Sequence, residues 1–269
     1  MNSVHEYDRP IPIADGISWV GFYEEKTNLH CNPYLIVEGD QAVLIDGGSR
    51  PDFAVVMMKI LQAGLQPGQI TALIYHHYDP DLCGSMANLV DIIDNPSLQI
   101  LSDPLDRIFL TYYLGKENHS LLKTVNFTDR GYVFNGRKLR FLRTPFCHNA
   151  GNFVTYDAKT KTLFSSDLFG SFSKTWELYT RLGEDCYTCR GYKSCPIGRP
   201  YCPLPDIIKF HQKIMPSGKA LKYAMEQIRP LDIELIAPQH GGIIAGKSDI
   251  AFLIDKLANL QGVGIDAYL

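Results

Sequence analysis

The sequence lacks a long apolar run, an excess of basic residues and an N-terminal leader pattern, and each absence removes a class of protein. Without a long apolar run, no membrane-spanning helix is expected. The net charge is −3, from 26 Lys and Arg against 29 Asp and Glu, so no basic surface for nucleic acid or anionic lipid is predicted. Residues 1–12 are polar and contain two prolines, which does not fit a signal peptide. These features favour a cytoplasmic protein without nucleic-acid or membrane partners.

Helix-like and strand-like segments alternate along the 269 residues, of which 45% are hydrophobic. That is enough to bury the core of one domain spanning residues 1–269. Apolar runs predict strands at 17–23, 33–37, 41–45, 70–75, 98–101, 153–156, 162–164 and 233–237. Helical spacing predicts helices at 52–63, 82–93, 104–114, 205–229 with an interruption near 216–218, and 248–260. Residues 125–144 are turn-rich β structure with a hairpin turn at Asn135-Gly136. This order predicts an α/β fold of two mixed sheets packed face to face, with helices outside.

Four short stretches place a histidine or a carboxylate where a predicted strand gives way to a loop. In the first, His77, Asp79 and Asp81 alternate at a period of two, which in an extended segment points all three to one side. Pro80 keeps Asp79 extended. The other stretches contribute His148, Asp167 and His240. One imidazole and two carboxylates on one side form a mixed nitrogen and oxygen metal site.

Each stretch alone also has an ordinary explanation. The first reads as a polar loop, His148 as a hydrogen-bonded loop histidine, Asp167 as a helix cap or turn residue, and His240 beside Gly241 as part of a tight turn. Their joint occurrence, in this order and each after a strand, indicates a metal centre.

The same stretches resemble the metallo-β-lactamase superfamily. The closer similarity is to its flavodiiron branch and to stand-alone oxygen-binding diiron proteins. Residues 163–170, LFSSDLFG, resemble the flavodiiron segment with the bridging aspartate, and residues 237–241, APQHG, its last ligand segment. Residues 16–21 and 32–36 resemble its opening strands. The similarity runs from about residue 13 to about residue 260, with a gap in the cysteine-rich segment, and it implies an αββα sandwich.

The resemblance implies a role for each candidate ligand of a non-haem two-iron cofactor. His77, Asp79 and His148 would bind the first iron, Asp81 and His240 the second, and Asp167 would bridge both. The sequence departs from the flavodiiron pattern at two positions. Asp79 stands where the family usually has Glu, and Leu82 stands where it usually has His, so Leu82 cannot bind metal.

Three carboxylates and three imidazoles form a harder ligand set than that of the zinc hydrolases, and such a set favours iron. Leu82 would line open positions of the second iron, and Tyr78 could donate a hydrogen bond to bound oxygen. We expect a peroxo-type dioxygen adduct and a role as an O2 or redox sensor that signals to a partner in trans. An O2 or NO reductase fed by an external electron donor stays open, as does a zinc-dependent hydrolase. A homodimer is a candidate assembly.

Four of the seven cysteines, Cys186, Cys189, Cys195 and Cys202, lie in a segment rich in glycine and proline at about residues 183–204. We interpret it as an inserted loop. Four thiolates at this spacing fit a zinc site or an iron–sulfur cluster; unligated thiols or a redox disulfide are the alternatives. The chain ends at Leu269, so we expect no flavodoxin domain and no FMN here. A cluster in the loop would then be a route for electrons.

Overall fold

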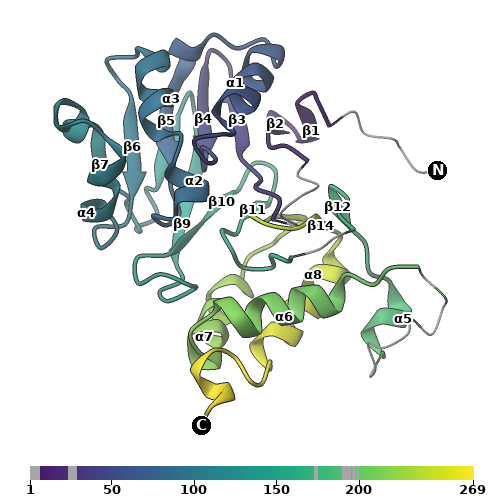
Figure 1. The fold of residues 1–269 in the computed structure, drawn as a ribbon. Coiled ribbons are helices and arrows are strands. Elements are labelled where there is room, and N and C mark those ends of the chain that lie inside the picture. Colours follow the sequence, from purple (N-terminus) through teal and green to yellow (C-terminus); the bar gives the residue numbers. More distant parts are fainter. Residues whose placement is uncertain (1–6, 24–28, 173–174, 190–194, 196–197, 199) are drawn as a thin grey trace. The chain divides into compact units, whose positions relative to one another are not determined.

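The computed structural model describes residues 7–23, 29–172, 175–189, 195, 198 and 200–269. The chain forms two compact units (Figure 1). The first contains the described residues up to 23, residues 30–141 and residues 157–160. The second contains Leu29, residues 142–156 and the described part of 161–269.

A seven-stranded mixed sheet forms the centre of the first unit. In spatial order its strands are β1 (Ile11–Ala14), β2 (Ile17–Trp19), β3 (Tyr34–Glu38), β4 (Gln41–Ile45), β5 (Ile70–Ile74), β6 (Gln99–Ser102) and β7 (Leu122–Thr124). β1 to β4 pair antiparallel, whereas β4 to β7 pair parallel. Because β4 and β5 are parallel, the loops that follow them leave the sheet at the same edge.

Short helices cover one face of this sheet, as Figure 1 shows for α1 (Phe53–Gln62), α2 (Pro80–Cys83) and α3 (Met86–Ile93). The other helical segments of the unit are η1 (Pro67–Gln69), α4 (Arg107–Leu110), η2 (Thr111–Tyr113) and η3 (Lys116–Leu121). The predicted helix at 82–93 is two helices. Gly84 lies between them. Its Cα packs so closely against the backbone at Arg50 that a Cβ would come within 2.8 Å of the Arg50 nitrogen.

A hairpin of β8 (Tyr132–Phe134) and β9 (Arg137–Arg143) confirms the predicted turn, with Asn135 and Gly136 both at positive φ. Buried Arg137 donates to Asp157 through Nη2 (2.7 Å) and Nε (3.2 Å). Burial alone would raise the pKa of the Asp157 carboxyl, but the hydrogen bonds from Arg137 and Thr160 hold it below its usual value. This ion pair ties two distant segments of the first unit together.

In the second unit, a mixed sheet has the order β12 (Tyr179–Thr180), β14 (Ile243–Ala245), β13 (Leu235–Ala237), β11 (Thr162–Phe164) and β10 (Phe153–Asp157). β11 and β13 are parallel, with Phe164 opposite Ala237. β14 pairs antiparallel with β13 and parallel with β12. The predicted architecture of two mixed sheets with flanking helices is confirmed, although β12 and β14 are too short for the sequence pattern to have revealed them.

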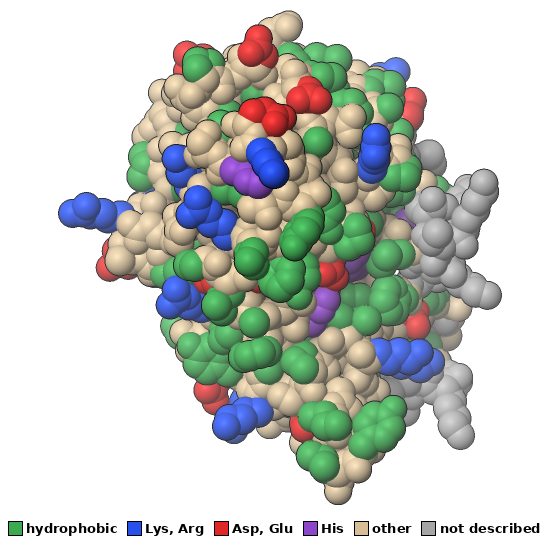
Figure 2. Space-filling model, turned by 60° about the vertical axis from the view of Figure 1, so that its left-hand side comes forward, with side chains coloured by type: hydrophobic (Ala, Val, Ile, Leu, Met, Phe, Trp, Pro, Cys, Tyr) green, Lys and Arg blue, Asp and Glu red, His purple; other side chains and the backbone are tan. Residues whose placement is uncertain are grey.

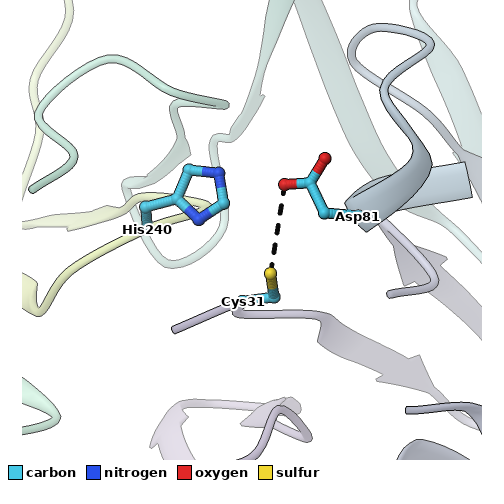
Figure 3. A group of neighbouring side chains, drawn as sticks. All are labelled: Cys31, Asp81 and His240. Carbon is cyan, nitrogen blue, oxygen red and sulfur yellow. Dashed lines mark hydrogen bonds between the residues drawn. The ribbon is translucent and has the colours of Figure 1, made fainter. Parts of the chain in front are cut away.

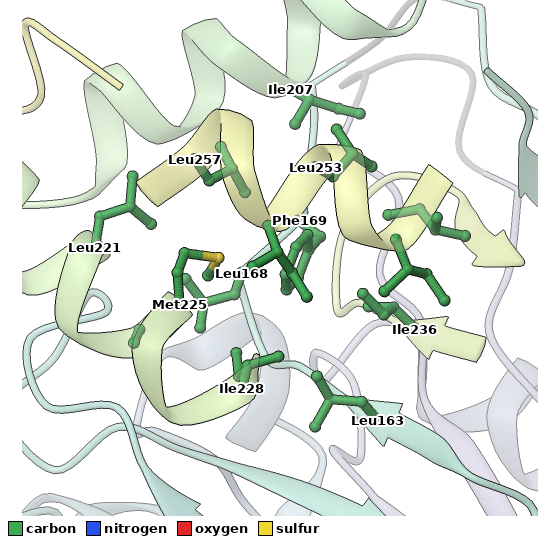
Figure 4. Packing of buried hydrophobic residues seen from close by; sticks show 14 of the residues in the cluster. Leu163, Leu168, Phe169, Ile207, Leu221, Met225, Ile228, Ile236, Leu253 and Leu257 are labelled. Atoms are coloured by element: carbon green, nitrogen blue, oxygen red, sulfur yellow. The ribbon is translucent and has the colours of Figure 1, made fainter. Parts of the chain in front are cut away.

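Helices α6 (Leu204–Ile214), α7 (Gly218–Ile228) and α8 (Lys247–Ala258) enclose the hydrophobic core of the second unit (Figure 4). Ser217 caps α7 by accepting a hydrogen bond from the Ala220 nitrogen. Leu168 and Phe169, which directly follow Asp167, are buried in this core. Two further short helices are α5 (Glu184–Tyr187), in the segment predicted to lack regular structure, and η4 (Ile265–Ala267).

Charged side chains of both signs are interspersed on the face of the described residues shown in Figure 2, in keeping with the small net charge. Across the described part of the chain, no helix combines the length and the apolar character needed to cross a bilayer.

Candidate metal centre

The loop after β5 carries the first group of candidate ligands, and an aspartate after the neighbouring strand anchors it. The Asp46 carboxylate accepts a hydrogen bond from the His76 backbone nitrogen (3.2 Å) and contacts His76 Nδ1 (2.8 Å). Both residues are buried. Sequence reasoning missed this pair, although the parallel pairing of β4 and β5 is what brings the two loops together.

His77 and Asp79 lie together in this loop. His77 Nε2 is 3.8 Å from Asp79 Oδ2, and the His77 side chain is only 1% exposed. The Cys83 thiol donates to the His77 carbonyl (3.3 Å), and the Tyr113 hydroxyl donates to the Tyr78 carbonyl (2.8 Å). The backbone of the loop is therefore fixed on both sides of Tyr78.

Asp81 does not share the extended conformation of the loop, so the expectation of three ligands in one extended segment is wrong. Pro80 begins α2, a position that suits its fixed φ and missing N–H, and Asp81 lies in the first turn. Within the same unit, the Asp81 carboxylate faces Cys31, a residue that the sequence did not single out. The dashed line in Figure 3 marks the 3.9 Å contact between Cys31 Sγ and Asp81 Oδ2.

The two candidates for an oxygen pocket, Leu82 and Tyr78, are both held by packing in the first unit. Leu82 is fully buried in the hydrophobic cluster of that unit. The Tyr78 ring stacks on Phe109 with centroids 4.3 Å apart. Burial raises the pKa of the Tyr78 hydroxyl, and the charges of Asp106 and Asp79 add to this. Tyr78 therefore keeps its hydroxyl proton, and its role toward oxygen stays a prediction.

In the second unit, two histidines converge on one carboxylate. His148 Nε2 lies 3.1 Å from Asp167 Oδ2, and His240 Nε2 lies 3.6 Å from Asp167 Oδ1. The Asp167 side chain is 4% exposed. Since β11 and β13 are parallel and in register, the loops that carry Asp167 and His240 leave the sheet at the same edge. Each carboxylate oxygen thus faces a different imidazole, as a bridging carboxylate would.

Asn152 connects the loop of His148 to the loop of Asp167. Its amide nitrogen Nδ2 donates to Thr144 Oγ1 (2.8 Å), and its Oδ1 accepts from Ser166 Oγ (3.0 Å). The side chain is buried. Nothing in the sequence distinguished this asparagine from an ordinary turn residue.

His211 of α6 fixes the turn that follows Asp167. Its Nε2 accepts from the Phe169 backbone nitrogen (2.9 Å), and its Nδ1 lies 2.7 Å from the Ile207 carbonyl, to which it donates. Burial lowers the pKa of His211 to about 4, against the opposing effects of the Ile207 hydrogen bond and the Asp167 charge. A neutral imidazole matches this pattern of one acceptor and one donor. No sequence pattern indicated this role, because His211 lies far from the motifs.

The four clustered cysteines are not alike. Cys186 is buried in the core of the second unit, whereas Cys189, Cys195 and Cys202 are partly exposed. Several residues between them lie outside the described part. Among the described residues, neither of the two side-chain groups with the spacing of metal ligands includes any of these four. The four-cysteine metal site therefore stays a prediction.

Comparison with solved structures identifies the class of fold. The structure described as "Peroxy diiron species of chemotaxis sensor ODP" matches with a TM-score of 0.74 at 22% identity, covering 96% of this chain and 97% of that chain. The flavodiiron protein from Giardia intestinalis matches with a TM-score of 0.76 at 18% identity, covering 94% of this chain and 60% of that chain. The fold is thus the flavodiiron type of metallo-β-lactamase fold, as predicted.

The chain belongs to the family described as "ODP family beta lactamase", whose model matches residues 29–241. The predicted resemblance to flavodiiron-like and stand-alone oxygen-binding diiron proteins is confirmed. Among curated relatives, "Type A flavoprotein fprA" of Rhodobacter capsulatus is 26% identical over 87% of this chain and 52% of its own length. "Anaerobic nitric oxide reductase flavorubredoxin" of Enterobacter sp. is 25% identical over 86% of this chain and 47% of its own length. The chain spans about half the length of these two relatives.

Proposed function

We propose that this protein binds two iron ions through His77, Asp79, Asp81, His148, Asp167 and His240, binds dioxygen there, and acts as an O2 or redox sensor. The observation that carries the proposal is the convergence of His148 and His240 on the two oxygens of Asp167. The family and the similarity to the chemotaxis sensor ODP support it.

The residues present fit such a cofactor. Imidazole and carboxylate donors suit iron, and a buried carboxylate with an imidazole at each oxygen needs a cation to offset its charge. When bound, ferrous iron would supply the electrons that dioxygen binding requires. His77, Asp79 and His148 would hold one ion, Asp81 and His240 the other, and Asp167 both.

The surrounding residues would keep these ligands in place. Asp46 orients His76 and with it the loop of His77. Asn152 joins the loops of His148 and Asp167, and neutral His211 holds the turn after Asp167. Outer partners of this kind preserve the orientation and basicity of metal ligands. Leu82 would keep the ligand loop packed on an apolar core rather than on water.

A reductase is the second candidate, and a specific finding favours it. One of the curated relatives is described as a nitric oxide reductase. Sensor and reductase would use the same ligands and differ in whether the oxygen adduct persists or turns over. A sensor would pass its state to a signalling partner, whereas a reductase would receive electrons from a donor.

Metal analysis and stopped-flow spectroscopy test the proposal. Protein purified without oxygen should contain two irons per chain, and one equivalent of O2 should give an absorption change that decays slowly. Rapid repeated turnover of O2 or NO with reduced rubredoxin would replace the sensor with the reductase. Two zinc ions and robust ester or phosphodiester hydrolysis would contradict both.

The four-cysteine segment is a separate part of the proposal, supported by its thiol spacing alone. It would hold an iron–sulfur cluster or zinc and, if a cluster, would pass electrons to the two-iron centre. Replacing Cys189 and Cys195 with serine should then remove acid-labile sulfide and slow reduction of the centre without loss of its two irons. Unchanged sulfide, zinc and reduction rate in the variant would end this part.

A further inference from the structure

Cys31 is held in a fixed place in the first unit, just before β3. The Gly21 Cα packs against its backbone, since a Cβ on Gly21 would lie 2.5 Å from the Cys31 carbonyl oxygen. The next residue, Asn32, accepts a hydrogen bond from Trp19 Nε1 (2.9 Å), and the Val20 nitrogen donates to the Pro33 carbonyl (3.0 Å). The cysteine is 4% exposed. Its thiol therefore has little freedom to turn elsewhere.

The thiol and the Asp81 carboxylate point toward one another (Figure 3). Cys31 Sγ and Asp81 Oδ2 are 3.9 Å apart. A transition metal with bonds of about 2.3 Å to sulfur and about 2.1 Å to oxygen places two ligand atoms about 3–4 Å apart. The observed separation lies within that interval, so one ion can bridge both atoms with small side-chain adjustments.

The resemblance implies a second metal position with one ligand fewer than the flavodiiron pattern usually has. Leu82 occupies the place where the flavodiiron pattern usually has histidine, and it is fully buried in the apolar cluster with residues such as Leu44 and Met86. Only Asp81, His240 and the shared Asp167 are proposed for this ion. Cys31 approaches Asp81 of α2 from the segment before β3 and supplies a donor atom that Leu82 cannot.

We infer that Cys31 is a ligand of the second metal ion, beside Asp81, and that its thiolate compensates for Leu82. The inference rests on the proposed two-metal centre. On binding, the Sγ–H bond breaks, the metal–Sγ bond forms and one proton passes to solvent, with no change in oxidation state. A thiolate is a softer donor than the histidine it replaces and would shift the preference of this position among metals.

The alternative role is a weak hydrogen bond from the Cys31 thiol to Asp81 that persists when metal binds. The two roles differ in a spectroscopic property, because only a metal-bound thiolate gives a near-ultraviolet sulfur-to-cobalt charge-transfer band. Cys83 offers a matched control. It is a second buried thiol of the same unit, but it donates to the His77 backbone carbonyl (3.3 Å).

The experiment is anaerobic titration of the metal-free full chain with cobalt(II), for wild type, Cys31→Ser and Cys83→Ser. Cobalt per chain and near-ultraviolet absorption are both recorded. In wild type, part of the sulfur-to-cobalt charge-transfer band should appear as cobalt fills the second site. We expect this part of the band to be missing in Cys31→Ser. Its affinity there should fall at least about tenfold, since loss of a mere hydrogen-bond partner of a ligand already costs about 10- to 100-fold. Cys83→Ser should retain this part of the band.

Full retention of the band and the affinity in Cys31→Ser overturns the inference. Cys31→Ala and a circular dichroism spectrum of each variant guard against a folding defect. Failure of the proposed two-metal centre looks different, because wild type would then take up cobalt no better than His148→Ala or Asp167→Asn. If those two variants lose uptake while Cys31→Ser matches wild type, only the role of Cys31 is wrong.

Discussion

The two units carry their candidate ligands in different ways. In the first, the candidate ligands His77, Asp79 and Asp81 lie within five consecutive residues, and the Asp79 side chain is 31% exposed. In the second, His148, Asp167 and His240 come from three separate loops, and the carboxylate at their centre is 4% exposed. A contiguous motif owes its geometry to one loop, whereas a dispersed one depends on strand pairing and on residues such as Asn152. Metal affinity should therefore be more sensitive to substitutions in the second group than to substitutions in the first.

The largest effect should come from Asp167→Asn. The substitution removes the negative charge that faces both His148 and His240, and with it the proposed bridge between the two metals. We expect metal affinity to fall by more than about 100-fold, beyond the range for loss of an outer partner, as measured by competition with a chelator. The control is Asp129→Asn, since Asp129 is 96% exposed. Two tightly bound metals in Asp167→Asn would contradict a bridging role.

Arg137→Met should destabilise the first unit without touching a candidate ligand. It leaves the Asp157 carboxylate buried and without its ion-pair partner, which costs about 3–5 kcal/mol in comparable buried pairs. Urea unfolding measures the change. Lys159→Met, which removes an exposed pair with Glu38, should change stability far less because water screens that pair. Equal effects of the two substitutions would show that burial of Arg137 is not decisive.

His211 makes the stability of the second unit depend on pH. Its pKa is about 4 in the folded protein against 6.5 for the unfolded chain, so unfolded protein takes up the proton first as pH falls. The stabilising contribution is complete above pH 6.5 and is lost as pH falls toward 4. About 2.5 pKa units correspond to about 3 kcal/mol.

The metal-free His211→Leu variant tests this dependence by chemical unfolding between pH 4 and 7. It should be about 1–3 kcal/mol less stable at pH 7, because the Phe169 N–H loses its acceptor. The difference from wild type should shrink as pH falls. A difference independent of pH would contradict the assignment of His211 as a neutral buried group.

Asn152→Leu should weaken metal binding through geometry alone. The variant loses the hydrogen bonds to Thr144 and Ser166 that join two ligand loops, and outer partners of ligands are worth about 10- to 100-fold in affinity. Isothermal titration with cobalt(II) measures the change. The control is Asn95→Leu in the first unit, where the Asn95 side-chain amide donates to the backbone carbonyls of Gly68 and Ile70. Unaltered affinity in Asn152→Leu would show that the His148 and Asp167 loops hold their positions independently.

Asp79→Glu should have the smallest effect. The Asp79 side chain is 31% exposed, against 1% for that of His77, and Asp79 lies directly before α2. A longer arm there can adjust in solvent, so we expect metal affinity to change less than about tenfold, in a titration run beside wild type. A loss as large as that of Asp167→Asn would erase the contrast between the two groups.

The sequence predicted the elements whose patterns are long or punctuated by turns. Helices α1, α6, α7 and α8 and the hairpin at Asn135-Gly136 were expected within a few residues of their observed bounds. The strands β12 and β14, of two and three residues, were missed because so short a segment cannot show the alternation of apolar and polar residues that identifies a strand. Asp81 was placed in an extended segment because Pro80 was interpreted as extending the chain before it, whereas Pro80 also begins a helix.

The residues around the ligands were harder to predict than the ligands themselves. Motif order and resemblance pointed to the six candidate ligands, but Asp46, Asn152 and His211 reach the loops through strand pairing or from a distant helix. Cys31 escaped notice for the same reason, since it lies 50 residues from Asp81 in sequence. Such contacts depend on how strands and helices pair in the tertiary fold, and a single sequence does not show this pairing.

Metal content of the anaerobically purified protein is the most direct test of the two-iron centre. Iron, zinc and acid-labile sulfide are measured per chain, for wild type and Asp167→Asn, after growth in iron-rich medium. We expect wild type to contain two irons per chain beyond any iron matched by sulfide, and we expect Asp167→Asn to lose these two irons. Two zinc ions with almost no iron, or equal iron in the two proteins, would contradict it.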